Sequence, residues 1–224
     1  MYADKRSHRG STRHQVGDVL LSVLAARAPE LSRHTIEVGE LAAATGRGLG
    51  LVGDELDLVR RAGDLHDIGK VAIPDAIVDK AGPLDPGEWE LMRTHAAIGE
   101  RILNAAPALR PVARLVRSSH ERWDGGGYPD GLAGEAIPLG ARIVAVCDAY
   151  EAMTSARVYR AVVTPADALA ELERCAGTQF DPSVVAAFAD AVAAAAQAAA
   201  AAQRMVSSEK SYAEGRGNPA PRAA

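Results

Sequence analysis

The chain has 224 residues, of which 48% are hydrophobic and 24% are charged, so it can form a globular domain with a sizeable core and is not a disordered chain. Aromatic residues make up only 4%, which favours packed helices with an aliphatic core over a β-sandwich. The formal net charge of -4 lacks the basic excess of proteins that bind nucleic-acid polymers, and we expect no such partner. The two cysteines, Cys147 and Cys175, lie far apart in apolar helical patterns and indicate reduced core residues.

The N-terminal segment, residues 1–15, is basic and polar, and we expect a flexible leader rather than a signal peptide because no apolar stretch follows it. From residue 16 to residue 190, apolar side chains recur at helical spacing, and no segment alternates for long enough to indicate a sheet. Helix starts are marked where a capping residue precedes a proline, at Asp85-Pro86, Thr164-Pro165 and Asp181-Pro182. The sequence therefore predicts an all-α domain over residues 16–190.

The C-terminal segment, residues 191–224, is predicted to be an alanine-rich helical extension, with a disordered tail beyond Ser207. The best candidate for a membrane span, residues 184–202, is mostly alanine and contains Asp190 and Gln197. Insertion requires more Leu, Ile and Phe, so we predict no membrane segment. Without a signal peptide or a span, we expect a cytoplasmic protein.

One long connection, residues 122–138, is rich in glycine and interrupts the helical pattern completely. Loops of this length in compact domains are usually functional or disordered. Trp123 and Tyr128 within this loop favour an ordered, functional segment.

Four histidines lie on predicted helices or at their ends: His34, His66, His95 and His120. Imidazole and carboxylate groups are ligands for Mn, Fe and Zn, and helical bundles build such sites from side chains that face inward. His66 and Asp67 are adjacent, so an imidazole and a carboxylate come within reach of one metal. The two oxygens of Asp67 allow it to bridge to a second ion.

Two further acids are candidates for the same site. Asp148 lies in an otherwise apolar stretch, where an unpaired carboxylate is costly to bury, so we expect either a metal or an ion pair with Arg142 or Arg157. Glu30 lies four residues before His34 and shares its helical face. A first-turn acid that interacts with the helix dipole is an equally good interpretation of Glu30.

Several separated motifs follow one another in the order of a known family. They are HDIGK at residues 66–70, HERWDGGGYPDGL at 120–132, CDAYEAMTSARVYR at 147–160 and GTQFDP at 177–182. In this order and spacing the chain resembles the HD-GYP family, whose members are helical HD-superfamily phosphodiesterases that hydrolyse the bacterial second messenger cyclic di-GMP. The resemblance implies an HD-domain helical bundle with a long glycine-rich GYP loop, which converts cyclic di-GMP to pGpG and in some cases on to GMP.

The resemblance also implies roles for individual residues. It implies two divalent metal ions, iron or manganese, with a third in some members, and a catalytic pair in which Asp67 bridges the ions and Lys70 contacts a phosphate oxygen. The implied metal ligands are Glu30, His34, His66, Asp67, His95, His120 and Asp148. The implied substrate contacts are Lys70, Gly127, Tyr128, Pro129, Arg157 and Arg160.

The chain departs from the family pattern at two positions. Ser119 stands where the family usually has a histidine, which predicts a second metal site that is weaker or completed by water, and Val158 stands beside Arg157 where a proline is usual. A non-catalytic module is therefore an alternative: it would bind cyclic di-GMP, or a protein partner through the glycine-rich loop. A second alternative is an HD phosphohydrolase of another nucleotide, and cyclic GMP-AMP is a further candidate substrate.

Overall fold

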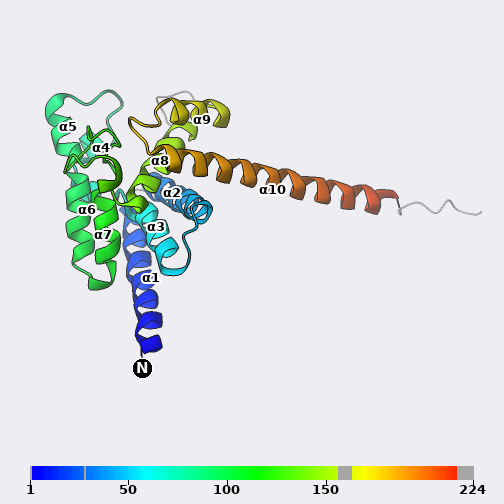
Figure 1. Cartoon of the computed structure of the whole chain (residues 1–224), viewed down its shortest axis with the longest axis horizontal. Helices are drawn as coiled ribbons and strands as arrows, with labels where there is room; N and C mark the ends of the chain where they lie inside the picture. Colours follow the sequence, from blue (N-terminus) through cyan, green and yellow to red (C-terminus); the bar gives the residue numbers. More distant parts are fainter. Residues whose placement is uncertain (1, 28, 156–162, 216–224) are drawn as a thin grey trace, which may run out of the picture.

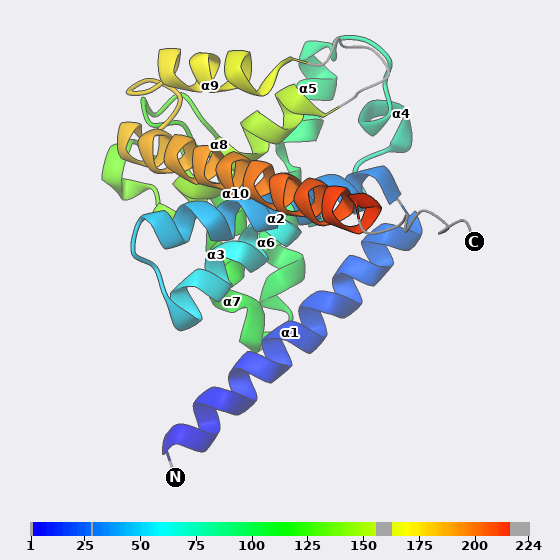
Figure 2. The ribbon, with the colours of Figure 1, turned by 90° about the vertical axis from the view of Figure 1, so that its right-hand side faces the viewer.

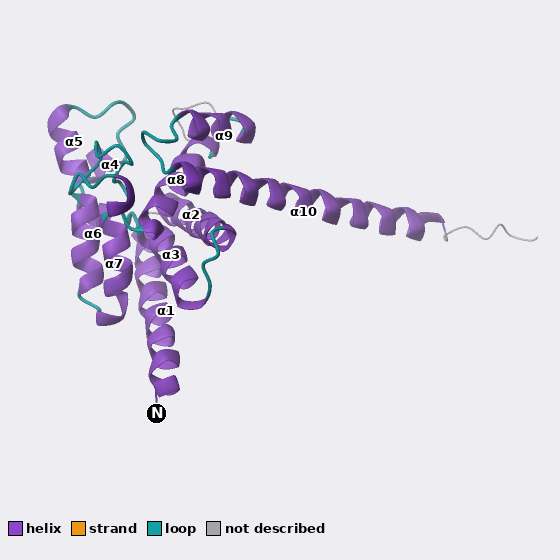
Figure 3. Ribbon diagram, viewed as in Figure 1, coloured by secondary structure: helices purple, strands orange, loops and turns teal. Residues whose placement is uncertain are grey.

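The computed structural model describes the backbone of residues 2–27, 29–155 and 163–215, and within these ranges it contains helices and loops but no strand (Figures 1 and 3). Side chains are described for residues 12–26, 33–155 and 163–205. The predicted all-α fold is confirmed. The α-helices are, in chain order, α1 (Tyr2–Arg27), α2 (Pro29–Gly48), α3 (Gly53–Leu65), α4 (Asp75–Val78), α5 (Pro86–Arg93), α6 (His95–Asn104), α7 (Arg110–Arg117), α8 (Leu139–Thr154), α9 (Pro165–Arg174) and α10 (Pro182–Gly215).

Helices α2, α3, α7 and α8 surround the main core, whose side chains are aliphatic as the composition predicts. Helices α2 and α3 meet backbone to backbone, because a Cβ placed on Gly63 would lie only 2.7 Å from the Cα of Gly39. This contact holds the end of α3 against the middle of α2. The fully buried core side chains of these helices include Val38, Ala42, Ala62, Leu65, Val112, Val116, Ile143 and Val144.

A short 3-10 helix, η1 (Ile68–Ala72), continues the chain after α3 and packs directly on the start of α6. A Cβ placed on Gly69 would lie 1.9 Å from the carbonyl oxygen of His95, so only glycine allows this approach. Helix α6 then pairs with α7 through the 3-10 helix η2 (Pro107–Leu109). As a result, the residues between α3 and η1 lie beside the first residue of α6.

The predicted helix starts are confirmed at α5, α9 and α10. Asp85 accepts a hydrogen bond from the backbone N–H of Glu88 at 2.9 Å, and Glu88 closes the capping box. Thr164 caps α9 by accepting from the N–H of Asp167 at 3.2 Å, and Asp181 precedes the first residue of α10. These caps satisfy N–H groups that have no partner within the helix.

The N-terminal segment, for which a flexible leader was expected, has a helical backbone from residue 2 onward. Helix α1 runs without interruption from Tyr2 to Arg27, so residue 15 is not a structural boundary. Arg13 is 8% exposed and donates to Asp57 at 2.8 Å, and Arg61 of α3 donates to Asp18 of α1 at 2.9 Å. Arg13 and Asp18 of α1 thus have partners of opposite charge more than forty positions away, which local sequence patterns do not reveal.

Helix α10 begins inside the domain and then projects from it (Figures 1 and 2). Val184 and Phe188 near its start are fully buried, and the ring of Phe188 packs edge-on against Tyr150 at 4.9 Å. The helix continues past Ser207, where the sequence suggested a disordered tail, as far as Gly215. By length and composition alone, residues 182–205 are apolar enough to cross a membrane, and 17% of an 18-residue window within this stretch is buried in the domain.

Candidate metal centre

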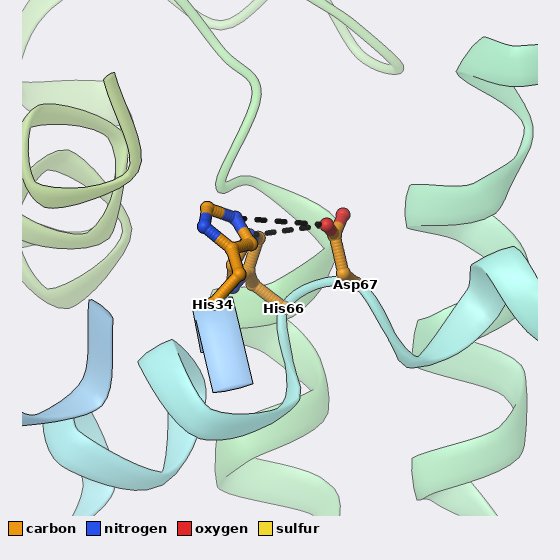
Figure 4. Close-up of side chains that lie close together, drawn as sticks. All are labelled: His34, His66 and Asp67. Carbon is orange, nitrogen blue, oxygen red and sulfur yellow. Dashed lines mark ion pairs between the residues drawn. The ribbon is translucent and has the colours of Figure 1, made fainter. Parts of the chain in front are cut away.

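Six of the seven expected metal ligands have described side chains, and all six converge at one place in the bundle. His34 lies on α2, His66 and Asp67 follow α3, His95 begins α6, His120 follows α7, and Asp148 lies on α8. Figure 4 shows His34 and His66 side by side, with their rings directed toward the carboxylate of Asp67. A shared metal site requires these side chains, which are far apart in the sequence, to meet in the fold, and they do.

The first group of donors contains two imidazoles and two carboxylates. His34 Nε2 lies 3.1 Å from Asp148 Oδ1 and 4.0 Å from Asp67 Oδ2. His66 Nε2 lies 3.5 Å from Asp67 Oδ2 and 3.6 Å from Asp148 Oδ1. The two imidazole nitrogens and the two carboxylate oxygens therefore face a common point.

The second group shares Asp67 with the first. Asp67 Oδ1 lies 3.4 Å from His95 Nε2, and this nitrogen lies 2.8 Å from His120 Nε2. The ligand atoms of Asp67, His95 and His120 all lie within 4.8 Å of one another, as do those of His34, His66 and Asp67. Because each oxygen of Asp67 faces a different group, its carboxylate has the position of a bridge.

Two buried polar atoms without hydrogen-bond partners indicate whether the two donor groups fit metal ions. His66 Nε2 and Asp67 Oδ1 have no hydrogen-bond partner among the described residues, although both residues are only 1% exposed. A buried polar atom without a partner costs about 1–3 kcal/mol. Nitrogen and carboxylate oxygen donors in this arrangement suit a divalent Mn, Fe or Zn ion, which would satisfy both atoms. The donor set therefore fits divalent metals.

Backbone carbonyls orient two of the imidazoles. The Nδ1–H of His66 donates to the carbonyl oxygen of Gly63 at 2.8 Å, and that of His95 donates to Met92 at 2.7 Å. Because Nδ1 of each ring is engaged with a carbonyl, Nε2 is the nitrogen that faces Asp67. Such outer contacts select the tautomer that can bind a metal.

The surroundings keep the second group in its metal-binding protonation state. Burial lowers the pKa of His95, and it lowers the pKa of His120 to about 3, so both imidazoles are neutral near pH 7. Burial by itself raises the pKa of Asp67, but the positive charges of Lys70 and His66 outweigh it and hold this pKa well below its ordinary value. Asp67 is therefore an ionised carboxylate between neutral and cationic partners.

His34 has a carboxylate as its outer partner, and this residue was missed in the sequence analysis. Glu151 on α8 is 5% exposed, accepts a hydrogen bond from His34 Nδ1, and also accepts one from Ser155 Oγ. Burial lowers the pKa of His34, but hydrogen bonds to Asp148 and Glu151 outweigh it and raise this pKa to about 9. The available signal was an acid three residues after Asp148, on the same helical face.

Lys70, expected to contact phosphate, lies at the same centre. Its Nζ donates to Asp67 Oδ2 at 2.6 Å, while a quarter of its side chain, 24%, remains exposed. The lysine therefore pairs with the shared carboxylate and still reaches the solvent side of the centre.

The GYP loop is ordered against the second group, in agreement with the expectation for residues 122–138. The Tyr128 ring stacks on His120 with centroids 5.2 Å apart and planes 7° apart, and its N–H donates to the His120 carbonyl at 3.2 Å. A Cβ on Gly127 would lie 2.5 Å from the Cα of Glu121, so this position accepts only glycine. The Tyr128–Pro129 peptide bond is cis.

Charged side chains hold the loop in place. Glu121, which is 4% exposed, accepts from the backbone N–H of Asp130 at 2.7 Å and of Leu132 at 3.1 Å. Arg117 of α7 makes two hydrogen bonds to Asp130, each 2.7 Å long, and a third to Glu100 of α6. The loop is thus tied to the α6–α7 pair that carries His95 and His120.

A cavity of about 250 Å³ lies beside the centre. His120 and Asp148 line one part of it, the loop lines another, and two residues of α5 that the sequence analysis did not consider, Trp89 and Arg93, complete the wall. The remaining lining residues are Ser119, Glu121, Arg122, Gly126, Gly127, Tyr128, Ala145, Ala149, Gln179 and Phe180.

Of the two arginines considered as ion-pair partners of Asp148, only Arg142 lies among the described residues. Arg142 donates to Asp181 at 2.6 Å instead of to Asp148, whose nearest charged neighbours are imidazoles. Ser119 is 2% exposed, and its hydroxyl donates to the Val116 carbonyl at 2.9 Å.

Four of the residues singled out in the sequence lie wholly or partly outside the described structure. The backbone of Glu30 lies in the first turn of α2, but its side chain is outside the described residues. Arg157, Val158 and Arg160 also lie outside them.

A comparison with known protein families identifies the family of this chain. Residues 18–184 match the HD domain family. The chain belongs to the HD-domain family. Together with the similarity to cyclic di-GMP phosphodiesterases, this match confirms the resemblance to HD-GYP proteins at the level of the family.

Curated relatives of this HD domain are bacterial phosphodiesterases. It is 40% identical over 176 residues to a cyclic di-GMP phosphodiesterase of Thermotoga maritima, and the aligned region makes up 78% of this chain and 48% of the relative. It is 38% identical over 168 residues to 3'3'-cGAMP-specific phosphodiesterase 2 of Vibrio cholerae, and the aligned region makes up 74% of this chain and 32% of the relative. The chain thus spans half or less of the length of these relatives.

A solved structure shares the fold. An HD-GYP protein of Bdellovibrio bacteriovorus superimposes with a TM-score of 0.62 over 82% of this chain and 64% of its own, at 17% sequence identity. At this identity the likeness concerns the fold of the HD domain.

Proposed function

We propose that this HD domain is a metal-dependent phosphodiesterase that hydrolyses cyclic di-GMP to the linear dinucleotide pGpG, with GMP as the product of a second cleavage. The observation that carries the proposal is the arrangement of two donor groups around the shared carboxylate of Asp67, beside a cavity of about 250 Å³. The relatives named as cyclic dinucleotide phosphodiesterases support this substrate class.

The metal site in this proposal holds two divalent ions, iron or manganese. His34, His66, Asp67 and Asp148 hold one ion, and Asp67, His95 and His120 hold the other. Glu30 is the candidate for a third ion. When bound, such ions lower the pKa of a water molecule and neutralise charge on a phosphodiester, which is the chemistry that this reaction needs.

The protein's own residues then position the substrate and stabilise developing charge. Lys70 is held by Asp67 at 2.6 Å, and from there its ammonium group donates to a non-bridging oxygen of the phosphodiester. Tyr128, stacked on His120, closes the GYP side of the site together with Gly127 and Pro129. Arg157 and Arg160, outside the described residues, are proposed as further phosphate or guanine contacts.

Cyclic GMP-AMP is a second candidate substrate, favoured by the likeness to a 3'3'-cGAMP-specific relative. A partner protein at the glycine-rich loop, residues 122–138, remains a proposal that rests on the exposure of several of its residues. We further propose that the protein acts in the cytoplasm, where a nucleotide second messenger is made and consumed.

The deciding experiment combines metal analysis with product analysis. Purified protein loaded with iron or manganese should hold two ions per chain and convert cyclic di-GMP to pGpG. Asp67→Ala should lose metal and activity and keep its helical circular dichroism, because Asp67 belongs to both donor groups. Lys70→Ala should keep its metal and lose roughly a hundredfold in rate, the typical cost of removing an oxyanion donor.

Three outcomes would contradict the proposal in different ways. Undiminished hydrolysis by Asp67→Ala would defeat the metal-dependent mechanism. Tight binding of cyclic di-GMP by the metal-loaded protein without any product would favour the non-catalytic alternative. Turnover of cyclic GMP-AMP alone would reassign the substrate.

A further inference from the structure

Helix α5 presents an aromatic residue and a cation to the cavity, one helical turn apart. Trp89 and Arg93 both line the cavity that His120 and Asp148 also line. The Arg93 guanidinium carbon lies 5.9 Å from the centroid of the Trp89 ring and 5.5 Å from that of Tyr128. Because Tyr128 also stacks on His120, a continuous row of side chains links Arg93 to the proposed metal centre.

Charge balance distinguishes Arg93 from other cations near the cavity. Arg122 donates to Asp124 at 2.7 Å, and Lys70 donates to Asp67 at 2.6 Å. No carboxylate among the described residues forms an ion pair with Arg93. Its contacts with the faces of two aromatic rings hold the guanidinium in position but leave its charge and hydrogen-bond donors available for an anion.

Trp89 is a large aromatic side chain that the fold leaves substantially uncovered. It is 46% exposed at the cavity wall, whereas Trp123, the only other tryptophan of the chain, is only partly exposed. An exposed indole beside an unpaired guanidinium is the combination that recognises a nucleotide, because the base stacks on the ring and the phosphate pairs with the cation.

We propose that Trp89 and Arg93 form a subsite for the half of a cyclic dinucleotide that is not being cleaved. In this subsite Arg93 binds the second phosphate, and Trp89 stacks on the attached purine. The inference rests on the proposed function, since it assumes that the other phosphate lies at the metal centre. It identifies α5 as the element that distinguishes a dinucleotide from a simple phosphodiester.

The first test compares two substrates in metal-loaded protein. Arg93→Gln should raise KM for cyclic di-GMP about tenfold to a hundredfold while kcat and metal content stay near those of the unsubstituted protein, and Trp89→Ala should raise it about tenfold. Hydrolysis of bis(p-nitrophenyl) phosphate, which has neither a purine nor a second phosphate, should be unchanged in Arg93→Gln. The matched control is Arg101→Gln, which removes an exposed arginine of α6 that does not line the cavity.

The second test observes Trp89 directly and does not require turnover. Because the chain has two tryptophans, Trp123→Phe leaves Trp89 as the only indole. Addition of cyclic di-GMP should quench its fluorescence, and Arg93→Gln in this background should weaken the apparent affinity at least tenfold. Trp89→Phe in the natural background should restore most of the affinity that Trp89→Ala loses, because phenylalanine keeps a stacking face.

The outcomes separate the subsite from the enzymatic activity. If the protein hydrolyses cyclic di-GMP and Arg93→Gln leaves KM unchanged, the subsite is wrong and the proposed function stands. If the protein does not hydrolyse cyclic di-GMP, the fluorescence titration still decides: quenching that depends on Arg93 supports the subsite, and no quenching overturns it. Equal losses of activity toward cyclic di-GMP and bis(p-nitrophenyl) phosphate in Arg93→Gln would show that Arg93 acts on the metal centre instead.

Discussion

Gly69 offers a direct way to separate the two donor groups without changing any ligand. It lies in η1, two residues after Asp67, and faces the first turn of α6. A Cβ at this position would lie 1.9 Å from the His95 carbonyl oxygen and 2.7 Å from the backbone nitrogen of Gly99. These are backbone atoms, so a clash cannot be relieved by rotating a side chain.

The size of the effect follows from these distances. Ordinary contact begins near 3.4 Å, so Gly69→Ala requires η1 and α6 to separate by about 1.5 Å along this direction. The distance between Asp67 Oδ1 and His95 Nε2, which is 3.4 Å, would then increase to about 5 Å. That separation is too large for one ion to bind both atoms. Overpacking of this kind costs about 1–3 kcal/mol in stability, and a displacement of about 1 Å at a catalytic site costs about a hundredfold in rate.

The assay measures metal content, unfolding and turnover on the same preparations. We expect Gly69→Ala to hold one ion per chain instead of two, to lose about 2–3 kcal/mol in urea unfolding, and to lose about a hundredfold in rate. Gly82→Ala is the matched control, because a Cβ there meets nothing within 4 Å. Gly99→Ala, whose Cβ would lie 3.1 Å from a Val116 methyl group, should have an intermediate effect. Normal metal content and stability in Gly69→Ala would refute the proposed packing of η1 on α6.

Three other substitutions test separate parts of the site. Ser119 is buried and lines the cavity, and Ser119→His should raise the affinity for the second ion about tenfold in metal titrations. Unchanged metal content and rate would show that this departure from the family has no effect. Glu121→Ala removes the acceptor of two loop N–H groups and should lower the free energy of unfolding by about 3 kcal/mol in urea; a loss below about 0.5 kcal/mol would contradict its role in holding the loop. Glu151→Ala should weaken metal binding about tenfold to a hundredfold with unchanged circular dichroism, because His34 loses its orienting partner, and wild-type metal affinity would count against this.

Local sequence patterns were sufficient for the helical elements and for most of the residues that converge at the candidate metal centre. The helix starts at Asp85 and Thr164 could be predicted because a cap acts within three residues of its position. The adjacent pair His66 and Asp67 indicated a metal site because both ligands are close in the sequence. The same logic did not extend to α1, where the partner of Arg13 lies 44 residues away on α3.

The tertiary structure decided how closely the ligands approach one another and which neighbours support them. The family resemblance implied that Asp67 bridges two ions, but the sequence could not give the distances from its oxygens to the imidazoles, nor show that Glu151 orients His34 or that Arg93 reaches the cavity. Periodicity identifies the face of a helix that is buried, but it does not specify which other helix that face meets or how closely. Here those distances depend on direct backbone contacts at Gly63 and Gly69, which bring α2, α3 and α6 close enough for side chains from distant positions to meet.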